Sequence, residues 1–152
     1  MSHHCTIVTY GSEAYNQTVA LRTQILRKPL NLHFTPQQLA EEVNQVHFAT
    51  FSHAQTTEPQ ILACLILVPN EQTKQVKMRQ VAVADHIQKQ GVGAQLVRFA
   101  ENWAVQQGYT LMYCHARDTA VPFYLKLGYA VVGEGFTEVG IPHYYMERRL
   151  LR

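Results

Sequence analysis

The chain has few charged residues, and this shortage excludes some classes of partner. Charged side chains make up 16% of its 152 residues, and the net charge is +2 with histidine neutral. Typical globular domains carry roughly 25% charged residues. No run of like charges exceeds two residues, so the basic stripe of a nucleic-acid-binding protein is absent. No nucleic-acid partner is therefore expected, although a local cluster of donors could hold one anionic cofactor.

Cysteine is scarce, and long hydrophobic runs are missing. The three cysteines, Cys5, Cys64 and Cys114, are odd in number, which indicates free thiols rather than a disulfide framework. No apolar segment of a signal peptide opens the chain. The longest apolar run, residues 61–68, is too short to span a bilayer. These features predict a cytoplasmic protein without a membrane partner.

The hydrophobic content is 47%, which is enough to bury a core, and the length suits one domain over residues 1–152. Hydrophobic spacing and turn residues predict an alternation of strands and helices. Strands are expected at residues 6–10, 46–52, 61–68, 76–84, 111–115, 129–134 and 143–150, and helices at residues 13–27, 36–44, 91–107 and 120–127. Loops are expected at residues 54–59 and 135–142. The strand, helix and strand over residues 76–115 predict a parallel crossover, so the fold class is α/β (α+β) with a mixed sheet.

Two helices carry boundary signals of their own. Ser12 can cap the first helix, and Pro29 is expected to end it because proline disfavours helical backbone in the residue before it. Thr35, Pro36 and Gln38 form the pattern of a capping box with proline at the first helical position.

A glycine-containing turn, Gln88-Lys89-Gln90-Gly91-Val92-Gly93-Ala94, follows the strand at residues 76–84 and leads into the helix at residues 91–107. The first turn of a helix has unpaired backbone N–H groups and a positive dipole end, which together favour anions. Gly91 and Gly93 have no Cβ, so a diphosphate can approach the backbone closely. The turn therefore predicts a phosphate-binding site.

Two other glycine motifs do not fit this turn. A P-loop requires Gly-x-x-x-x-Gly-Lys-Ser/Thr, which the chain lacks, and a dinucleotide fingerprint would need glycine where Leu96 stands. The remaining pattern, Gln-x-x-Gly-x-Gly from Gln88, Gly91 and Gly93, resembles the pyrophosphate signature of the GNAT superfamily of N-acetyltransferases. The alternative is a glycine-containing turn without a ligand.

The resemblance implies a twisted, mostly antiparallel sheet of about six to seven strands flanked by about four helices. It also implies acetyl-CoA as co-substrate, and the residues that would hold its pyrophosphate are Gln88, Lys89, Gln90, Gly91, Val92, Gly93 and Ala94. The pantetheine arm would pair with the backbone of Val81, Ala82 and Val83. The Val83 N–H would stabilise the oxyanion, and losing such a donor typically costs about 3 kcal/mol of barrier.

A second segment, Ala120-Val121-Pro122-Phe123-Tyr124-Leu125-Lys126-Leu127-Gly128-Tyr129, also resembles the GNAT superfamily. By this resemblance Tyr124 is the general acid that protonates the departing CoA thiolate, and a phenol with a pKa of about 10 suits that role. The alternative is a core aromatic residue. Many family members have asparagine just before this helix, where this chain has Arg117, so a role in cofactor binding is predicted for Arg117.

The acceptor amine must lose a proton before it attacks, so a base is needed. Glu134, Glu138, His115 and His143 are candidates, and Glu138 and His143 could equally well pair with each other. Glu138 and His143 belong to the segment Glu-x-Gly-Ile-Pro-His-x-x-Met, which is similar to the same segment in one branch of the superfamily. No pair of histidines has helical i, i+4 spacing with an acidic partner, so no metal is expected.

The first helix carries Arg22 and Arg27, with Phe34 soon after. The resemblance implies that this region lines the acceptor site, where an arginine could pair with an acceptor carboxylate. The alternative is that both arginines are solvated.

These residues predict direct transfer of the acetyl group from acetyl-CoA to a primary amine in a ternary complex. The acceptor can be a small-molecule amine or a protein amine. A covalent route through Cys114 and a non-catalytic acyl-CoA-binding module are the alternatives. The Tyr- and Phe-rich strands at the C-terminus are compatible with a homodimer.

Overall fold

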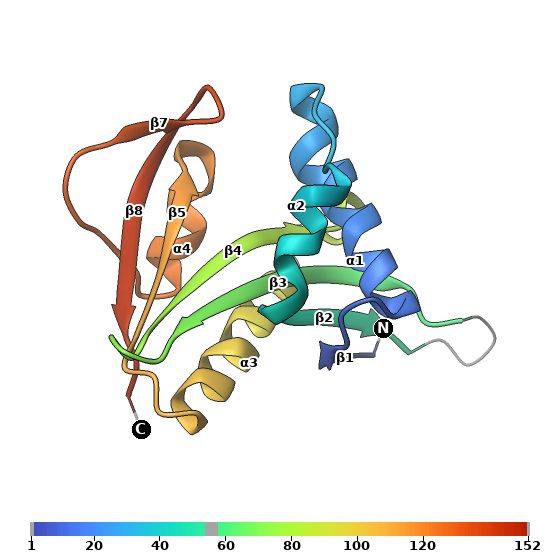
Figure 1. The fold of residues 1–152 in the computed structure, drawn as a ribbon, viewed down its shortest axis with the longest axis horizontal. Helices are drawn as coiled ribbons and strands as arrows, with labels where there is room; N and C mark the ends of the chain where they lie inside the picture. Colours follow the sequence, from blue (N-terminus) through green and yellow to red (C-terminus); the bar gives the residue numbers. More distant parts are fainter. Residues whose placement is uncertain (1, 54–57, 152) are drawn as a thin grey trace. The chain divides into compact units, whose positions relative to one another are not determined.

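The computed structural model describes residues 2–53 and 58–151 (Figure 1). Residues 54–57 of the expected hairpin loop lie outside the described residues. The chain divides into two compact units, Met1–Leu67 with Gln80–Ala100 and Val68–Arg79 with Glu101–Arg152. Strands β3 and β4 and helix α3 each contribute residues to both units.

The first unit contains the strands β1 (His3–Val8), β2 (Val46–Ser52) and β3 (Ile61–Asn70). β2 pairs antiparallel with both β1 and β3. Its side chains alternate between two buried faces. Ala49 and Phe51 join the apolar cluster that includes Tyr15 of α1, while the Phe48 ring meets the Phe99 ring of α3 edge to face. Helices therefore cover both faces of these strands.

Helix α1 (Glu13–Arg22) begins where Ser12 accepts a hydrogen bond from the Tyr15 N–H, as predicted. It continues as a π-helical turn, η1 (Thr23–Arg27), and a 3₁₀ turn, η2 (Lys28–Leu30). Pro29 lies within η2, so it tightens the last turn instead of ending the helix before it. The capping box of Thr35 and Gln38 is confirmed at the start of α2 (Pro36–Ala40). The 3₁₀ turn η3 (Glu41–Asn44) completes the predicted second helix.

In the part of the chain that the structure describes, the sheet has eight strands in the order β1-β2-β3-β4-β5-β8-β6, and β7 pairs with β8 beside this path. The crossover is parallel as predicted, because residues 75–77 of β4 (Gln75–Val83) pair in parallel with residues 111–113 of β5 (Leu111–Arg117). The pairings of β1 with β2, of β2 with β3, and of β8 with β5, β6 and β7 are antiparallel. With four α-helices, the predicted α/β class with a mostly antiparallel mixed sheet is confirmed.

Helix α3 (Val92–Gln106) is the longest helix, with 15 residues. Its predicted apolar stripe is buried at Val92, Leu96 and Ala100, and Gly108 follows with a left-handed φ of 91°. Within residues 2–53 and 58–151, no helix is both long and apolar enough to cross a membrane.

The second unit contains β5, the short helix α4 (Val121–Lys126), β6 (Ala130–Val131) and β8 (Ile141–Arg149). The predicted strand at residues 129–134 is reduced to β6, and the predicted linker at residues 135–142 contains an additional strand, β7 (Phe136–Glu138). β7 and β8 form a hairpin in which Glu138 pairs with Ile141. The turn between them consists of Val139 and Gly140, with φ values of 44° and 73°.

Val139 is strained, because a β-branched residue with positive φ is unfavourable by roughly 1–2 kcal/mol. Two positive φ values are typical of a type I′ turn, which prefers Asn-Gly. We expect Val139→Asn to raise the free energy of unfolding by about 1 kcal/mol, measured by urea denaturation. The control is Val43→Asn, because Val43 and Val139 are both 53% exposed but Val43 has ordinary backbone geometry. Equal effects of the two substitutions would contradict the strain argument.

Candidate functional site

The glycine-containing turn lies between β4 and α3, as predicted. Lys89 and Gly91 have left-handed φ values of 67° and 85°, and the first helical hydrogen bond runs from the Gln95 N–H to the Gly91 carbonyl at 3.0 Å. Helix geometry then leaves the N–H groups of Val92, Gly93 and Ala94 without intrahelical acceptors. These three donors and the positive end of a 15-residue helix form an anion site.

Gln88 organises this turn through its side chain. Its amide Nε2 donates to the Val83 carbonyl at 3.0 Å and to Asp85 Oδ1 at 3.3 Å. Gln88 therefore connects the end of β4 to the start of the turn. The turn is exposed from Gln88 to Gly91, whereas Val92 and Gly93 at the start of α3 are buried.

The strand before the turn has an irregularity of its own. Gln80 has a φ of 56°, and a non-glycine residue in this region is typical of a bulge or a functional site. The parallel ladder with β5 covers residues 75–77 of β4. The main-chain groups of Val81, Ala82 and Val83 lie beyond that ladder.

Tyr124 lies in α4, which starts with Pro122 in its first turn. The residue is 6% exposed, and its ring packs at 5.0 Å from Phe123 and 5.8 Å from Tyr129. Burial, and to a smaller extent the charge of a Cys114 thiolate, raise the pKa of Tyr124. The phenol therefore stays protonated at neutral pH, which a general acid requires.

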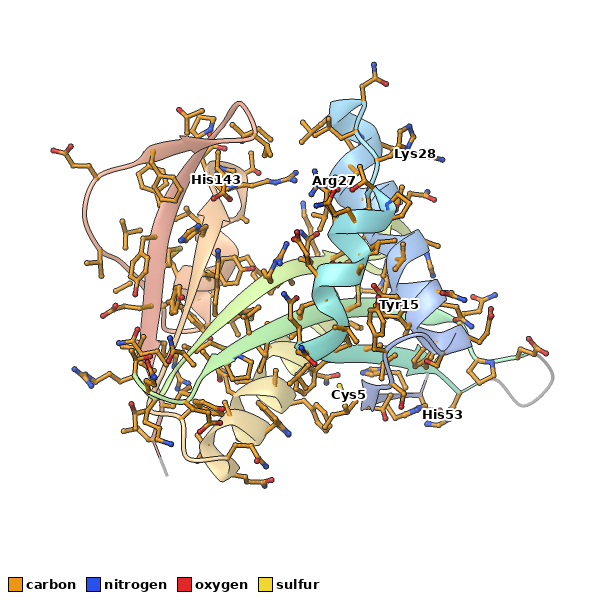
Figure 2. All side chains as sticks on the ribbon, in the orientation of Figure 1. Cys5, Tyr15, Arg27, Lys28, His53 and His143 are labelled. Carbon is orange, nitrogen blue, oxygen red and sulfur yellow. The ribbon has the colours of Figure 1, made fainter. Side chains whose placement is uncertain are left out.

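A carboxylate between two histidines forms the second cluster. Glu138 Oε1 lies 3.1 Å from His115 Nδ1, and Glu138 Oε2 lies 3.7 Å from His143 Nε2. Sheet register explains the assembly, because β8 pairs with β5 and β7 and Phe136 is opposite His143. Figure 2 labels His143 on β8. Burial alone would raise the pKa of Glu138, but the hydrogen bond and charge of His115 and the charges of His143 and Lys77 hold it below its usual value.

Comparison with known families decides the assignment. A family model described as an acetyltransferase (GNAT) domain matches residues 16–150, which include both the turn and the carboxylate cluster. The chain belongs to the GNAT acetyltransferase family.

Individual relatives of this GNAT chain agree with the assignment. It is 35% identical over 71 residues to YjcF of Bacillus subtilis, named as an uncharacterized N-acetyltransferase, with 46% of this chain and 51% of that protein covered. The chain spans about half the length of the curated relatives it matches. A crystal structure from Lactobacillus plantarum has a TM-score of 0.83 at 22% identity, covering 99% of this chain and 100% of that one.

A second solved structure is that of an aminoglycoside 6'-N-acetyltransferase complexed with coenzyme A. It has a TM-score of 0.77 at 14% identity, and 98% of each chain is covered. At this level of identity, the two structures establish that this chain has the GNAT fold.

The predicted site residues of this GNAT domain fall into two groups. Residues 81–83 and 88–94 belong to the first unit, and Arg117, Tyr124, Glu138 and His143 belong to the second. Arg117 is opposite His143 in the sheet register. Glu134 is exposed between β6 and β7, away from the contacts that join Glu138 to the two histidines. Within residues 2–53 and 58–151, no three His, Cys, Asp or Glu side chains are arranged to hold a metal ion.

Cys114 is unsuited to a covalent route. It is 2% exposed, and burial raises the pKa of its thiol to about 12. The reactive thiolate is therefore almost absent at neutral pH. Cys64 is buried as well, and Cys5 is half-buried, so the prediction of free thiols is confirmed.

Two buried carboxylates went unrecognised in the sequence. Glu101 of α3 is 4% exposed and accepts hydrogen bonds from the Tyr129 hydroxyl at 2.7 Å and from Arg148 at 3.1 Å. Because the Tyr129 ring packs on Tyr124, this network helps to position Tyr124, the candidate general acid. Helical spacing gave no signal for Glu101, because it lies about 180° around α3 from Val92.

The second is Glu42, which pairs with Arg22. The Arg22 guanidinium donates to both carboxylate oxygens of Glu42, at 2.8 and 2.9 Å, and Arg22 is fully buried. Arg22 is therefore not solvated, and its charge is already matched by Glu42 rather than left for an acceptor. The guanidinium groups of Arg22 and Arg27 also lie 4.8 and 4.4 Å from the Phe34 ring centroid. Figure 2 labels Arg27 and Lys28 in the helical segment that follows α1.

Proposed function

We propose that this chain transfers the acetyl group of acetyl-CoA to a primary amine by direct attack in a ternary complex. The observation that carries the proposal is the strand-to-helix turn at residues 88–94, which has the family's pyrophosphate motif at the amino end of α3 and is exposed from Gln88 to Gly91. A diphosphate would accept hydrogen bonds from the main-chain donors of Val92, Gly93 and Ala94. Lys89 and Gln90 would complete the cradle, and Arg117 would add a cationic contact to the cofactor.

The pantetheine arm would run beside β4. Val81, Ala82 and Val83 have main-chain groups beyond the β5 ladder, so an extended ligand could pair with them as an added strand. The Val83 N–H would then be the donor that stabilises the oxyanion. The Gln88 side chain supports this arrangement, because it binds the Val83 carbonyl and restrains the peptide next to the proposed donor.

Tyr124 would supply the proton that the sulfur needs on departure. Its protonation supports this role, since burial raises the pKa of Tyr124 above its ordinary value. On the acceptor side, Glu138 and His143 would form part of the site that receives the ammonium group. The acceptor would be a small-molecule amine or a protein amine.

The binding half of the proposal has a matched test in two glycines of the same helix. Gly91 and Gly108 flank α3, both have left-handed φ, and a Cβ added to either would meet no atom within 4 Å. Alanine should therefore cost a similar strain of roughly 1–2 kcal/mol at each position. We expect Gly91→Ala to raise the Kd for acetyl-CoA about tenfold or more, equivalent to ~1.4 kcal/mol, while Gly108→Ala leaves it unchanged. Calorimetric titration measures both values, and equal Kd values would place the pyrophosphate elsewhere.

The catalytic half is tested by thiol release from acetyl-CoA with a panel of polyamines, amino acids, aminoglycosides and lysine peptides. Saturable binding with amine-dependent thiol release supports acetyl transfer. Saturable binding without release from any amine would identify a non-catalytic acyl-CoA-binding module instead.

A further inference from the structure

The two histidines of the carboxylate cluster differ in the protein atoms that their ring nitrogens contact. Glu138 holds His115 through Nδ1 at 3.1 Å, and His143 is held through Nδ1 by the Ile141 carbonyl at 2.8 Å. Extending the proposed function, we propose that His115 Nε2 accepts the proton of the acceptor ammonium, with Glu138 and His143 as positioning residues. The site would thus act on protonated primary amines.

The tautomer of His115 follows from its partner. An ionised carboxylate can only accept hydrogen bonds, and the lowered pKa of Glu138 keeps it ionised at neutral pH. Nδ1 of His115 therefore carries the proton and donates it to Glu138 Oε1. Neutral His115 must then have its lone pair on Nε2. The same relation between carboxylate and imidazole prepares the base of a catalytic triad.

His143 cannot perform this role, because both of its nitrogens face protein atoms. Nδ1 donates to the Ile141 carbonyl, and Nε2 lies 3.7 Å from Glu138 Oε2. His143 is also only 4% exposed, while the His115 side chain is 28% exposed. His143 Nε2 therefore faces the second oxygen of Glu138, and His115 is the more accessible of the two rings.

Neighbouring strands hold the ring of His115. The Phe136 ring meets it edge to face at 5.1 Å, and Tyr145 and Tyr113 lie at 6.3 and 6.4 Å. Phe136 also stacks on His143 at 5.9 Å, so one phenyl ring contacts both imidazoles. The titratable and charged groups on the elements around His115 are Lys77 and Arg79 of β4, Tyr113, Cys114 and Arg117 of β5, Glu138 of β7, and His143, Tyr144, Tyr145, Glu147, Arg148 and Arg149 of β8.

The proposed step begins with an ammonium. One N–H bond breaks, its electron pair stays on the acceptor nitrogen, and a new N–H bond forms at His115 Nε2. The nitrogen lone pair forms the C–N bond with the acetyl carbon, and the C–S pair leaves with sulfur, which takes a proton from Tyr124. The nitrogen then releases a second proton, which restores Tyr124. His115 releases its proton to solvent, so each turnover yields amide, CoA thiol and one free proton.

The test is the pH dependence of kcat/KM with the amine that the panel identifies. We expect His115→Ala to lower kcat/KM about 100-fold or more and to remove the acidic limb. Added imidazole should restore part of the rate. Glu138→Gln should lower kcat/KM as well, because His115 loses the carboxylate that positions its ring. His53→Asn, at an exposed histidine that stacks on His4, is the control and should leave the profile unchanged.

A second measurement does not depend on activity. Proton–nitrogen NMR of the histidine rings in the full chain should show neutral His115 protonated at Nδ1, and Glu138→Gln should weaken that preference. Neutral His115 protonated at Nε2, or an acidic limb retained in His115→Ala, would overturn the proposal while acetyl transfer stands. If the ring protonation is as expected but no amine is acetylated, the proposed function fails and this role fails with it.

Discussion

Tyr124→Phe is expected to retain acetyl-CoA binding and to slow acetyl transfer by roughly one to four orders of magnitude, the range for loss of a general acid. The substitution removes one hydroxyl and leaves the ring that packs between Phe123 and Tyr129. Because burial raises the pKa of Tyr124 above the ordinary value of 10, the phenol is protonated throughout the neutral range. The lost rate should therefore appear at every pH from roughly 6 to 9.

Three measurements separate this effect from a structural one. Calorimetry should give the same Kd for acetyl-CoA, and thermal unfolding should give a similar Tm. Single-turnover rates with saturating cofactor should be slow. The control is Tyr144→Phe, which removes a hydroxyl from β8 in the same unit. If turnover in Tyr124→Phe stays within twofold of wild type, Tyr124 has no part in proton transfer.

The parts of the molecule visible in the sequence are those encoded by neighbouring residues. The capping box at Thr35, the strand β2 and the turn at residues 88–94 each depend on spacings of a few residues. Local hydrogen bonding and hydrophobic period determine such elements. The strand, turn and helix that carry the candidate cofactor residues could therefore be predicted from the local pattern.

The hairpin of β7 and β8 was missed for a local reason as well. A Val-Gly pair does not signal a tight turn, because valine avoids positive φ. Pairing with β8 holds the strained turn at residues 139–140 in place. This turn determines where Glu138 meets His115, so the candidate pairing of Glu138 and His143 is confirmed while the contact with His115 needed the structure.

The π-helical turn at Thr23–Arg27 could not be predicted from the sequence either. Such turns depend on tertiary contacts more than on propensity, and here both arginines of the segment gather around Phe34. The partners of the buried carboxylates could not be predicted from the sequence either. Glu101 and Glu42 have partners 47 and 20 positions away in the chain, and such distances leave no local pattern.

The second large effect is expected from Glu42→Gln. Glu42 is 2% exposed, accepts two hydrogen bonds from Arg22 and one from the Tyr15 hydroxyl at 2.8 Å, and thereby connects η3 to α1. Glutamine keeps the shape but leaves the Arg22 charge buried without a counter-charge. Breaking a buried pair in this way costs about 3–5 kcal/mol. At roughly 2–4 °C per kcal/mol for a chain of this size, Tm should fall by roughly 6–20 °C.

Glu41→Gln is the matched control, because Glu41 is the preceding residue and is exposed. It should change the free energy of unfolding by less than about 0.5 kcal/mol.

Acid should narrow the difference in free energy of unfolding between wild type and Glu42→Gln. Burial alone would raise the pKa of Glu42, but Arg22 and Tyr15 hold it below its usual value. A lowered carboxyl pKa gives stability that is complete above the unfolded value of about 4.3 and is lost as the pH falls through the folded value. Wild type should therefore lose stability in acid faster than Glu42→Gln. Urea titrations from pH 7 to 3 measure the free energy of unfolding of both proteins. Parallel pH dependences would show that the Arg22 and Glu42 pair does not contribute to the stability of the first unit.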